Sequence, residues 1–418
     1  MPQHVHTPQY GKPLAVLTSL FFMWGLITSL NDILVPHLKG VFSLSYVQAA
    51  LVQFSFFTAY FVVSLPAGRL VQAWGYQRGI VAGLCTAGAG CLLFYPAAAS
   101  LSYPAFLGAL FVLAAGITVL QVAANPYVTR LGAAKTASSR LNLTQAFNAL
   151  GTTVAPLLGA MLILVDSHDG AAAEASAVQL PYLVLAGVLF AIAVVFALLR
   201  LPAIKDDHAS ETSAGSEPAR RSVWQYRHLV LGAVAIFVYV GAEVSIGSFL
   251  VSLMEQPDVG GLNQADAGRL LAVYWGCAMV GRFLGSVVMR HVTASKVLAC
   301  NALLSVLLIA LAVACGGKLA MYSLLAVGLC NSIMFPTIFS LALHGLGRFT
   351  GAGSGVLCMA IVGGALMPLA QAALADSLGL LLSFVVPLLC YLFIFYYGVA
   401  GHKPRHTTPD LALATSAS

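Results

Sequence analysis

The feature that most constrains the fold is a series of long apolar runs separated by short polar ones. A helix needs about 20 mostly apolar residues to cross a bilayer, and twelve runs in this chain reach that length. Only 8% of the residues are charged, against roughly 25% in soluble domains, which excludes an ordinary globular enzyme. The sequence therefore predicts an all-α membrane protein with twelve transmembrane helices, at 14–38, 44–70, 79–99, 104–129, 140–165, 179–200, 228–254, 264–288, 295–315, 318–343, 351–375 and 379–399.

The basic residues predict the orientation of these helices. Seventeen of the 20 Lys and Arg side chains fall on one side of the predicted membrane, and the other side holds Lys39, Arg269 and Lys318. Because cytoplasmic loops carry an excess of Lys and Arg, we expect both termini in the cytoplasm. These loops also explain the net charge of +6, so we expect no nucleic-acid partner. The first run lacks the small-residue cleavage pattern of a signal peptide, so we expect it to be a spanning helix.

A polar, Ser- and Ala-rich segment interrupts the apolar pattern after the sixth run. It lacks apolar periodicity, as does the end of the chain, and such segments do not form a packed core. We therefore predict four parts: an N-terminal six-helix bundle at 14–200, a cytoplasmic linker at 201–227, a C-terminal six-helix bundle at 228–400, and a disordered cytoplasmic tail at 401–418.

The two predicted bundles share an internal repeat. Three features recur at separations of 213, 210 and 212 residues, and such agreement predicts two pseudo-symmetric halves. The recurring features are Gly68-Arg69 with Gly281-Arg282, Pro126 with Pro336, and Gly151 and Pro156 with Gly363 and Pro368.

Two carboxylates lie deep in apolar runs, Asp32 in the first and Glu243 in the seventh, 211 residues apart. They therefore occupy pseudo-symmetric positions. A charge in the middle of a membrane costs at least ~2.5–3.5 kcal/mol on insertion scales, so it normally faces a partner or a water-filled cavity. Such a carboxyl can load and release a proton or pair with Na⁺, and the residues alone do not choose between these. The alternative is that neighbouring hydroxyls cap both acids and that they only help packing.

Carboxamides form two further polar faces. Gln121 and Asn125 are four residues apart, and Gln145 and Asn148 are three apart, so each pair shares one face of a helix. Amides supply both donors and acceptors, which suits sugar hydroxyls better than an apolar drug. Amides also join helices to one another inside membranes, and this alternative stays open.

Trp275 and Asn331 complete the candidate binding residues. A Trp in a cavity can stack on a sugar ring, but it can equally pack within a bundle, and the same holds for the amide of Asn331. The other repeated residues are expected to serve gating: Arg69 and Arg282 as anchors at cytoplasmic helix ends, and Pro126 and Pro336 as kinks that free a backbone carbonyl.

Motifs of energy-converting and hydrolytic enzymes are absent from the sequence, including Walker, GxSxG and HExxH patterns. The eight Cys residues show no metal-ligand spacing. We therefore expect no enzyme, no metal and no cofactor, and we expect transport to be driven by an ion gradient.

Several stretches together resemble the fucose/galactose/glucose branch of the major facilitator superfamily, most closely the bacterial glucose/galactose transporters and more distantly the L-fucose/proton symporter. The stretches are LNDILVPHLK (30–39), LQVAANPYVTRLG (120–132), RLNLTQAFNALGTTVAP (140–156), GAEVSIGSFL (241–250), YWGCAMVGRFLGS (274–286) and FPTIFSLAL (335–343). The resemblance implies the twelve-helix fold of that superfamily, alternating access, a bacterial inner-membrane location and a monomeric unit.

The resemblance also implies roles for single residues. The family's proton-coupling aspartate of helix 1 matches Asp32, and its sugar-contacting Gln and Asn of helix 5 match Gln145 and Asn148. A membrane-embedded glutamate of the fucose symporter falls on Gln121, which cannot titrate, and that symporter has a Gln where Glu243 stands. These departures favour a hexose over fucose and leave the coupling cation, H⁺ or Na⁺, open.

The sequence thus predicts a secondary active transporter that brings a glucose- or galactose-type hexose into the cell with a cation. Asp32 and Glu243 would couple the ion, and Gln121, Asn125, Gln145, Asn148, Glu243, Trp275 and Asn331 would bind the sugar. The alternatives are a symporter of L-fucose or another sugar with a proton, a proton-coupled exporter on the same fold, and a sugar sensor that transports nothing.

Overall fold

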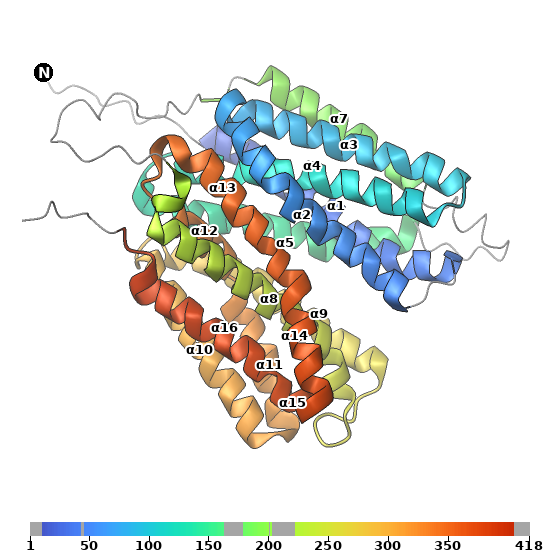
Figure 1. The fold of residues 1–418 in the computed structure, drawn as a ribbon, viewed down its shortest axis with the longest axis vertical. Coiled ribbons are helices and arrows are strands. Elements are labelled where there is room, and N and C mark those ends of the chain that lie inside the picture. Colours follow the sequence, from blue (N-terminus) through green and yellow to red (C-terminus); the bar gives the residue numbers. More distant parts are fainter. Residues whose placement is uncertain (1–10, 43–45, 163–178, 200, 203–221, 405–418) are drawn as a thin grey trace, which may run out of the picture.

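The structure, a computed structural model, describes residues 11–42, 46–162, 179–199, 201–202 and 222–404. Every regular element in these ranges is helical, and the helices form two bundles that lie side by side (Figure 1). Most of the linker expected at 201–227 and of the tail expected at 401–418 falls outside the described residues.

The first bundle contains the helices that precede the linker. They are α1 (Gly11–Phe42), α2 (Tyr46–Trp74), α3 (Tyr76–Ala99), α4 (Tyr103–Arg130), η1 (Ala134–Thr136), α5 (Ala137–Leu162) and α7 (Gln179–Leu198).

The second bundle has the same number of spans, but three of them are broken into shorter helices. Its elements are η2 (Val223–Gln225), α8 (Arg227–Glu255), α9 (Gln264–Val288), α10 (Ala294–Cys315), α11 (Gly317–Asn331), α12 (Met334–Ala342), η3 (Gly347–Phe349), α13 (Thr350–Met359), η4 (Ala360–Val362), α14 (Gly363–Leu378), α15 (Leu380–Ser383), α16 (Val385–Tyr396) and η5 (Tyr397–Gly401).

These bounds agree with the expected spans to within about a turn. Eleven stretches of the described residues are long and apolar enough to cross a membrane. The expected span that falls below this threshold is α5, because its first turns carry Ser138, Arg140, Asn142 and Gln145. Since α5 packs along α1 inside the first bundle, its polar side chains are covered by other helices and need not face lipid.

Two glycines let α1 and α5 approach until their backbones touch. A Cβ at Gly25 would collide with the carbonyl of Asn148, and a Cβ at Gly151 would collide with the carbonyl of Phe22. Ser29 Oγ adds a hydrogen bond of 3.1 Å to the carbonyl of Thr152. Small residues at helix crossings are typical of membrane bundles, where close packing replaces the hydrophobic driving force.

We expect Gly25→Ala to destabilise the protein because its methyl group must push α1 away from α5. Overpacking a tight core costs about 1–3 kcal/mol, so thermal unfolding of the purified protein should begin at a lower temperature. Gly108→Ala in α4 is the matched control, because a Cβ there has nothing within 4 Å. Equal melting temperatures for the two variants would contradict the tight α1–α5 contact.

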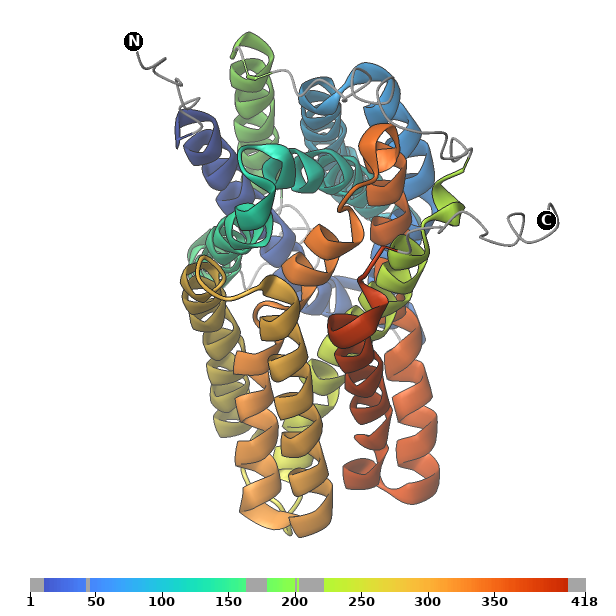
Figure 2. The same cartoon turned by 90° about the vertical axis from the view of Figure 1, so that its left-hand side faces the viewer.

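The bundles meet at one end of the molecule, which we call the closed end. It is the end where α1 begins and η5 finishes, and Figure 2 looks onto it. From there the bundles diverge toward the opposite, open end, as Figure 1 shows for α2 and α14.

Glycines let α2 and α13 pack closely at the closed end. A Cβ at Gly68 would lie 2.9 Å from the carbonyl of Gly351.

Hydroxyl and amide groups add hydrogen bonds between the bundles at the closed end. Three side chains of α5 reach the second bundle there. The pairs are Ser138 Oγ to Ser340 Oγ at 3.0 Å, Ser139 Oγ to the carbonyl of Ser286 at 2.5 Å, and Asn142 Nδ2 to Thr337 Oγ1 at 3.2 Å. Short polar contacts of this kind are individually weak.

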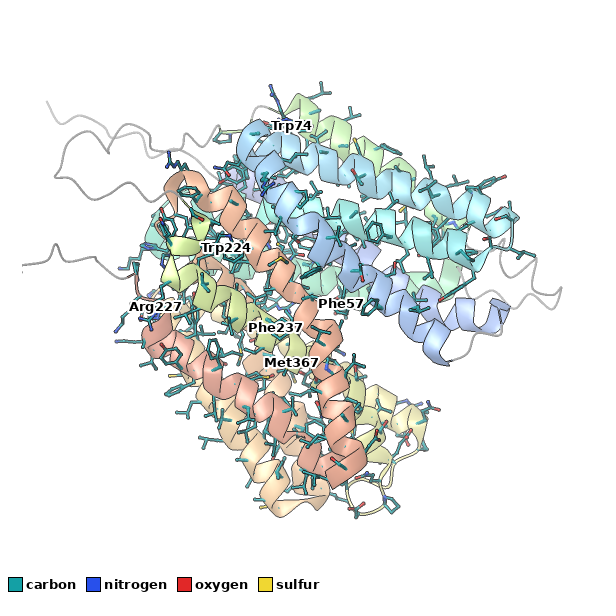
Figure 3. The ribbon with its side chains drawn as sticks, viewed as in Figure 1. Phe57, Trp74, Trp224, Arg227, Phe237 and Met367 are labelled. Atoms are coloured by element: carbon teal, nitrogen blue, oxygen red, sulfur yellow. The ribbon has the colours of Figure 1, made fainter. Side chains whose placement is uncertain are left out.

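Aromatic side chains join the bundles nearer the middle of the helices. Phe57 of α2 packs on Gly364, where a Cβ would lie 2.7 Å from its ring, and Figure 3 shows it beside Phe237 and Met367. On the other flank the rings of Phe147 (α5) and Phe283 (α9) meet edge to face, with centroids 5.6 Å apart. We call these aromatic contacts between the bundles the aromatic floor.

Candidate functional site

The second bundle holds a charged pair near its centre. Glu243, in the middle of α8, has its Oε1 atom 3.9 Å from Nη2 of Arg282 in α9, and both side chains are only 15% exposed. Tyr239, one turn earlier on α8, donates its hydroxyl to the same Oε1 atom at 2.8 Å. The carboxylate is therefore held by a cation and a phenol, one from each of two helices.

A break between α11 and α12 explains why Arg282 points inward. Pro336 has no N–H, so the carbonyl of Ser332, four residues earlier, cannot be satisfied within the helix. Arg282 Nε donates to that carbonyl at 3.0 Å. Gly281 allows this approach, because a Cβ there would lie 2.6 Å from Ser332 Cβ. The gating roles expected for Arg282 and Pro336 stay predictions.

Asn331 is the hub of the same network. Its Nδ2 atom donates to Tyr274 Oη at 2.7 Å, and its Oδ1 atom accepts from Tyr391 Oη at 2.6 Å. Its carbonyl lies 3.0 Å from Tyr239 Oη and shares the one proton of that hydroxyl with Glu243 Oε1. The side chain of Asn331 is fully buried. Its amide thus joins α9, α11 and α16, which favours a structural role over direct contact with a sugar.

Trp275 lies about two turns nearer the open end of α9 than Phe283 of the aromatic floor. It is 42% exposed and packs on Gly247 of α8, where a Cβ would lie 3.0 Å from the ring. Gly247 is one turn from Glu243. One turn further along α9, Met279 Sδ lies 3.6 Å from Thr153 Oγ1 of α5. Trp275 is therefore on the face of α9 that meets α5 one turn further along.

The carboxamides of the first bundle are buried and mostly paired with one another or with neighbouring helices. Gln121 Oε1 accepts from Tyr60 Oη at 2.8 Å, which parallels the pairing of Asn331 with Tyr274 in the second bundle. Gln145 Nε2 donates to Asn125 Oδ1 at 3.3 Å. Asn125 Nδ2, however, is buried without a partner among the described residues, and buried donors are rarely left unpaired.

Asn148 faces α1, because its Nδ2 donates to the carbonyl of Phe21 at 2.9 Å. Its side chain remains partly exposed, unlike Gln121 and Asn125. On α5, Asn148 follows Phe147 of the aromatic floor.

Pro126 and Arg69 differ from their counterparts in the second bundle. Pro126 frees the carbonyl of Val122, which accepts a hydrogen bond of 2.8 Å from Ser354 Oγ in α13. The freed carbonyl of the first bundle thus binds the other bundle, whereas that of Ser332 is bound within its own. Arg69 is exposed at the closed end of α2, so the two repeated Gly-Arg pairs lie in different surroundings.

Asp32 lies within α1, but its side chain is outside the part of the chain that the structure describes. Its backbone is on the open-end side of Gly25, on the helix that packs against α5.

The sequence profile of the Major Facilitator Superfamily matches residues 16–361 of this chain. The chain belongs to the Major Facilitator Superfamily.

Individual members of the superfamily agree with this assignment over nearly the whole length. A relative from Brucella abortus named glucose/galactose transporter is 58% identical over 406 residues, which is 96% of this chain and 98% of the relative. An L-fucose-proton symporter from Escherichia coli is 34% identical over 93% of this chain and 92% of its own. The crystal structure of FucP, solved in the outward conformation, superposes with a TM-score of 0.84 at 33% identity, covering 93% of this chain and 98% of that one.

The superfamily fold accounts for residues that the sequence alone did not single out for a role. Tyr60 donates a hydrogen bond to Gln121, and Tyr391 donates one to Asn331. Ser354 donates to the carbonyl that Pro126 leaves free. Tyr239 had a visible signal, since it precedes Glu243 by one helical turn. Tyr391 lies 60 residues from Asn331, and nothing in the local sequence indicates that pair.

Proposed function

We propose that this protein is a secondary active transporter that takes up a glucose- or galactose-type hexose together with a cation. The observation that carries the proposal is the Glu243–Arg282 pair in the middle of α8 and α9, together with the partly exposed side chains of Asn148 and Trp275. The 58% identical relative named glucose/galactose transporter supports the choice of sugar.

In this proposal the two bundles, residues 14–200 and 228–400, rotate against each other at the aromatic floor. Residues 201–227 form the linker between them. The closed end faces the cytoplasm of a bacterial cell, the open end faces outward, and the chain works as a monomer in the inner membrane. A sugar enters from the open end, and its hydroxyls exchange hydrogen bonds with water for bonds with Gln145, Asn148 and Glu243. Asn125, whose Nδ2 is unpaired, gains a partner as the bundles move.

We infer that the coupling cation is a proton and that Asp32 carries it, since the L-fucose-proton symporter is a 34% identical relative. Gln121 cannot titrate, and its amide is already bonded to Tyr60. Sodium is the alternative cation that the experiment must separate from the proton.

The test is uptake of radiolabelled galactose and glucose into proteoliposomes that contain the full chain. We expect accumulation above equilibrium when an inward proton gradient is imposed, and loss of that accumulation when a protonophore is added. A sodium gradient at constant pH forms the second arm, L-fucose tests the sugar, and protein-free liposomes are the control. Equilibration without accumulation under both gradients would overturn the coupling, and absence of any sugar flux would overturn the transporter assignment.

A further inference from the structure

The repeat-related arginines of the two halves lie in different surroundings. Glu243 has a cation 3.9 Å away, while Arg69, the repeat counterpart of Arg282, is exposed at the closed end. Arg282 is therefore largely covered beside a carboxylate, whereas its repeat counterpart Arg69 is exposed.

Two groups contact the Glu243 carboxylate and oppose its protonation: Arg282 from α9 and Tyr239 from α8 itself. Behind them, Asn331 of α11 joins Tyr239 to Tyr274 of α9 and Tyr391 of α16. Tyr239 already donates to Oε1, and Arg282 lies next to the same atom. A proton on Glu243 would leave the Arg282 cation buried without a counter-charge, and breaking a buried pair in this way is strongly unfavourable.

We propose that Glu243 stays ionised throughout the cycle and acts as a fixed hydrogen-bond acceptor for sugar hydroxyls, with Arg282 as the residue that positions it. This inference rests on the proposed sugar transport. It also narrows the set of residues that could carry the coupling cation, because Glu243 is no longer one of them. Among the described residues both contacts to the carboxylate go to Oε1, which leaves Oε2 to accept from the ligand.

This geometry also specifies the ligand. A carboxylate accepts hydrogen bonds and donates none, so it selects a sugar that presents a free hydroxyl toward α8. Trp275 lies one turn toward the open end beside Gly247, where its face can cover the apolar C–H side of the same ring. A pyranose with a hydroxyl on one edge and a C–H face next to it fits both groups, and an analogue that lacks that hydroxyl should bind weakly.

The test compares Glu243→Gln with wild type in proteoliposomes, using galactose and its monodeoxy analogues. We expect the KM for galactose to rise at least tenfold, while the ratio of cations to sugars moved and the pH profile of sugar exchange stay as in wild type. The variant should also lose its discrimination against one deoxy analogue. A merely structural role would lower the maximal rate and leave that discrimination intact.

Arg282→Lys and Glu243→Asp provide the second measurement and serve if Glu243→Gln fails to fold. Each variant keeps both charges of the pair but changes the length or shape of one side chain. We therefore expect a raised KM for galactose and an unchanged ratio of cations to sugars moved. A changed ratio or a shifted pH profile in any Glu243 variant would overturn this proposal while leaving sugar transport intact. Absence of sugar flux in wild type would instead overturn the proposed function itself.

Discussion

Asp32→Asn is expected to abolish concentrative uptake while leaving sugar exchange in place. Asparagine has nearly the size of aspartate but cannot take up or release a proton, so the gradient no longer drives the cycle. A membrane potential of 100 mV acting on one transported charge is worth ~2.3 kcal/mol, which corresponds to about 50-fold accumulation. The variant should therefore bring the internal sugar only to the external concentration, although preloaded vesicles should still exchange labelled for unlabelled galactose.

Asp376→Asn is the matched control, because Asp376 is an exposed carboxylate on α14. It should accumulate sugar as wild type does. Undiminished accumulation by Asp32→Asn would remove Asp32 from the coupling mechanism. Loss of exchange together with accumulation would place Asp32 in sugar binding or folding instead.

The sequence was sufficient to predict the fold because the bilayer restricts it. Only a helix satisfies its own backbone across about 30 Å of hydrocarbon, so apolar length alone locates each span. The repeat of Gly281-Arg282 and Pro336 after Gly68-Arg69 and Pro126 predicted two related halves, and the two six-helix bundles of the superfamily fold confirm this. The breaks within the second bundle were harder to predict, since they depend on which distant side chain satisfies a freed carbonyl.

The candidate site was predictable in its residues but not in its partners. Glu243 stood out as a carboxylate in an apolar run, yet Arg282 was expected at a helix end because it follows Gly281 near the close of α9. Its side chain instead binds the carbonyl of Ser332, 50 residues away in the sequence. No local sequence pattern predicts that contact. Likewise, the partners of Gln121 and Asn331 are tyrosines on other helices, which supports the reading that these two amides join helices.

Arg282→Met is expected to lower stability more than any other single change considered. Methionine fills similar apolar volume but removes the cation beside Glu243 and the donor to the Ser332 carbonyl. Breaking a buried pair by removing one partner costs about 3–5 kcal/mol, and an unsatisfied buried carbonyl adds about 1–3 kcal/mol. Purified Arg282→Met should therefore unfold at a much lower temperature than wild type in the same detergent, or fail to accumulate in the membrane.

Arg69→Met tests whether this cost comes from the site and not from loss of an arginine in general. Arg69 occupies the repeat-related position but is exposed, and surface substitutions usually change stability by no more than about 0.5 kcal/mol. If Arg69→Met destabilises as much as Arg282→Met, the buried network does not explain the effect.

A double variant separates the two interactions of Arg282. In Glu243→Gln with Arg282→Met, no carboxylate is left without its cation, so the part of the loss due to the ion pair should return. The part due to the Ser332 carbonyl should remain, since Pro336 still leaves it without a helical partner. The coupling energy of this double-mutant cycle therefore measures the charge pair alone. A coupling energy near zero would mean that Arg282 stabilises the break between α11 and α12 and contributes nothing to holding Glu243.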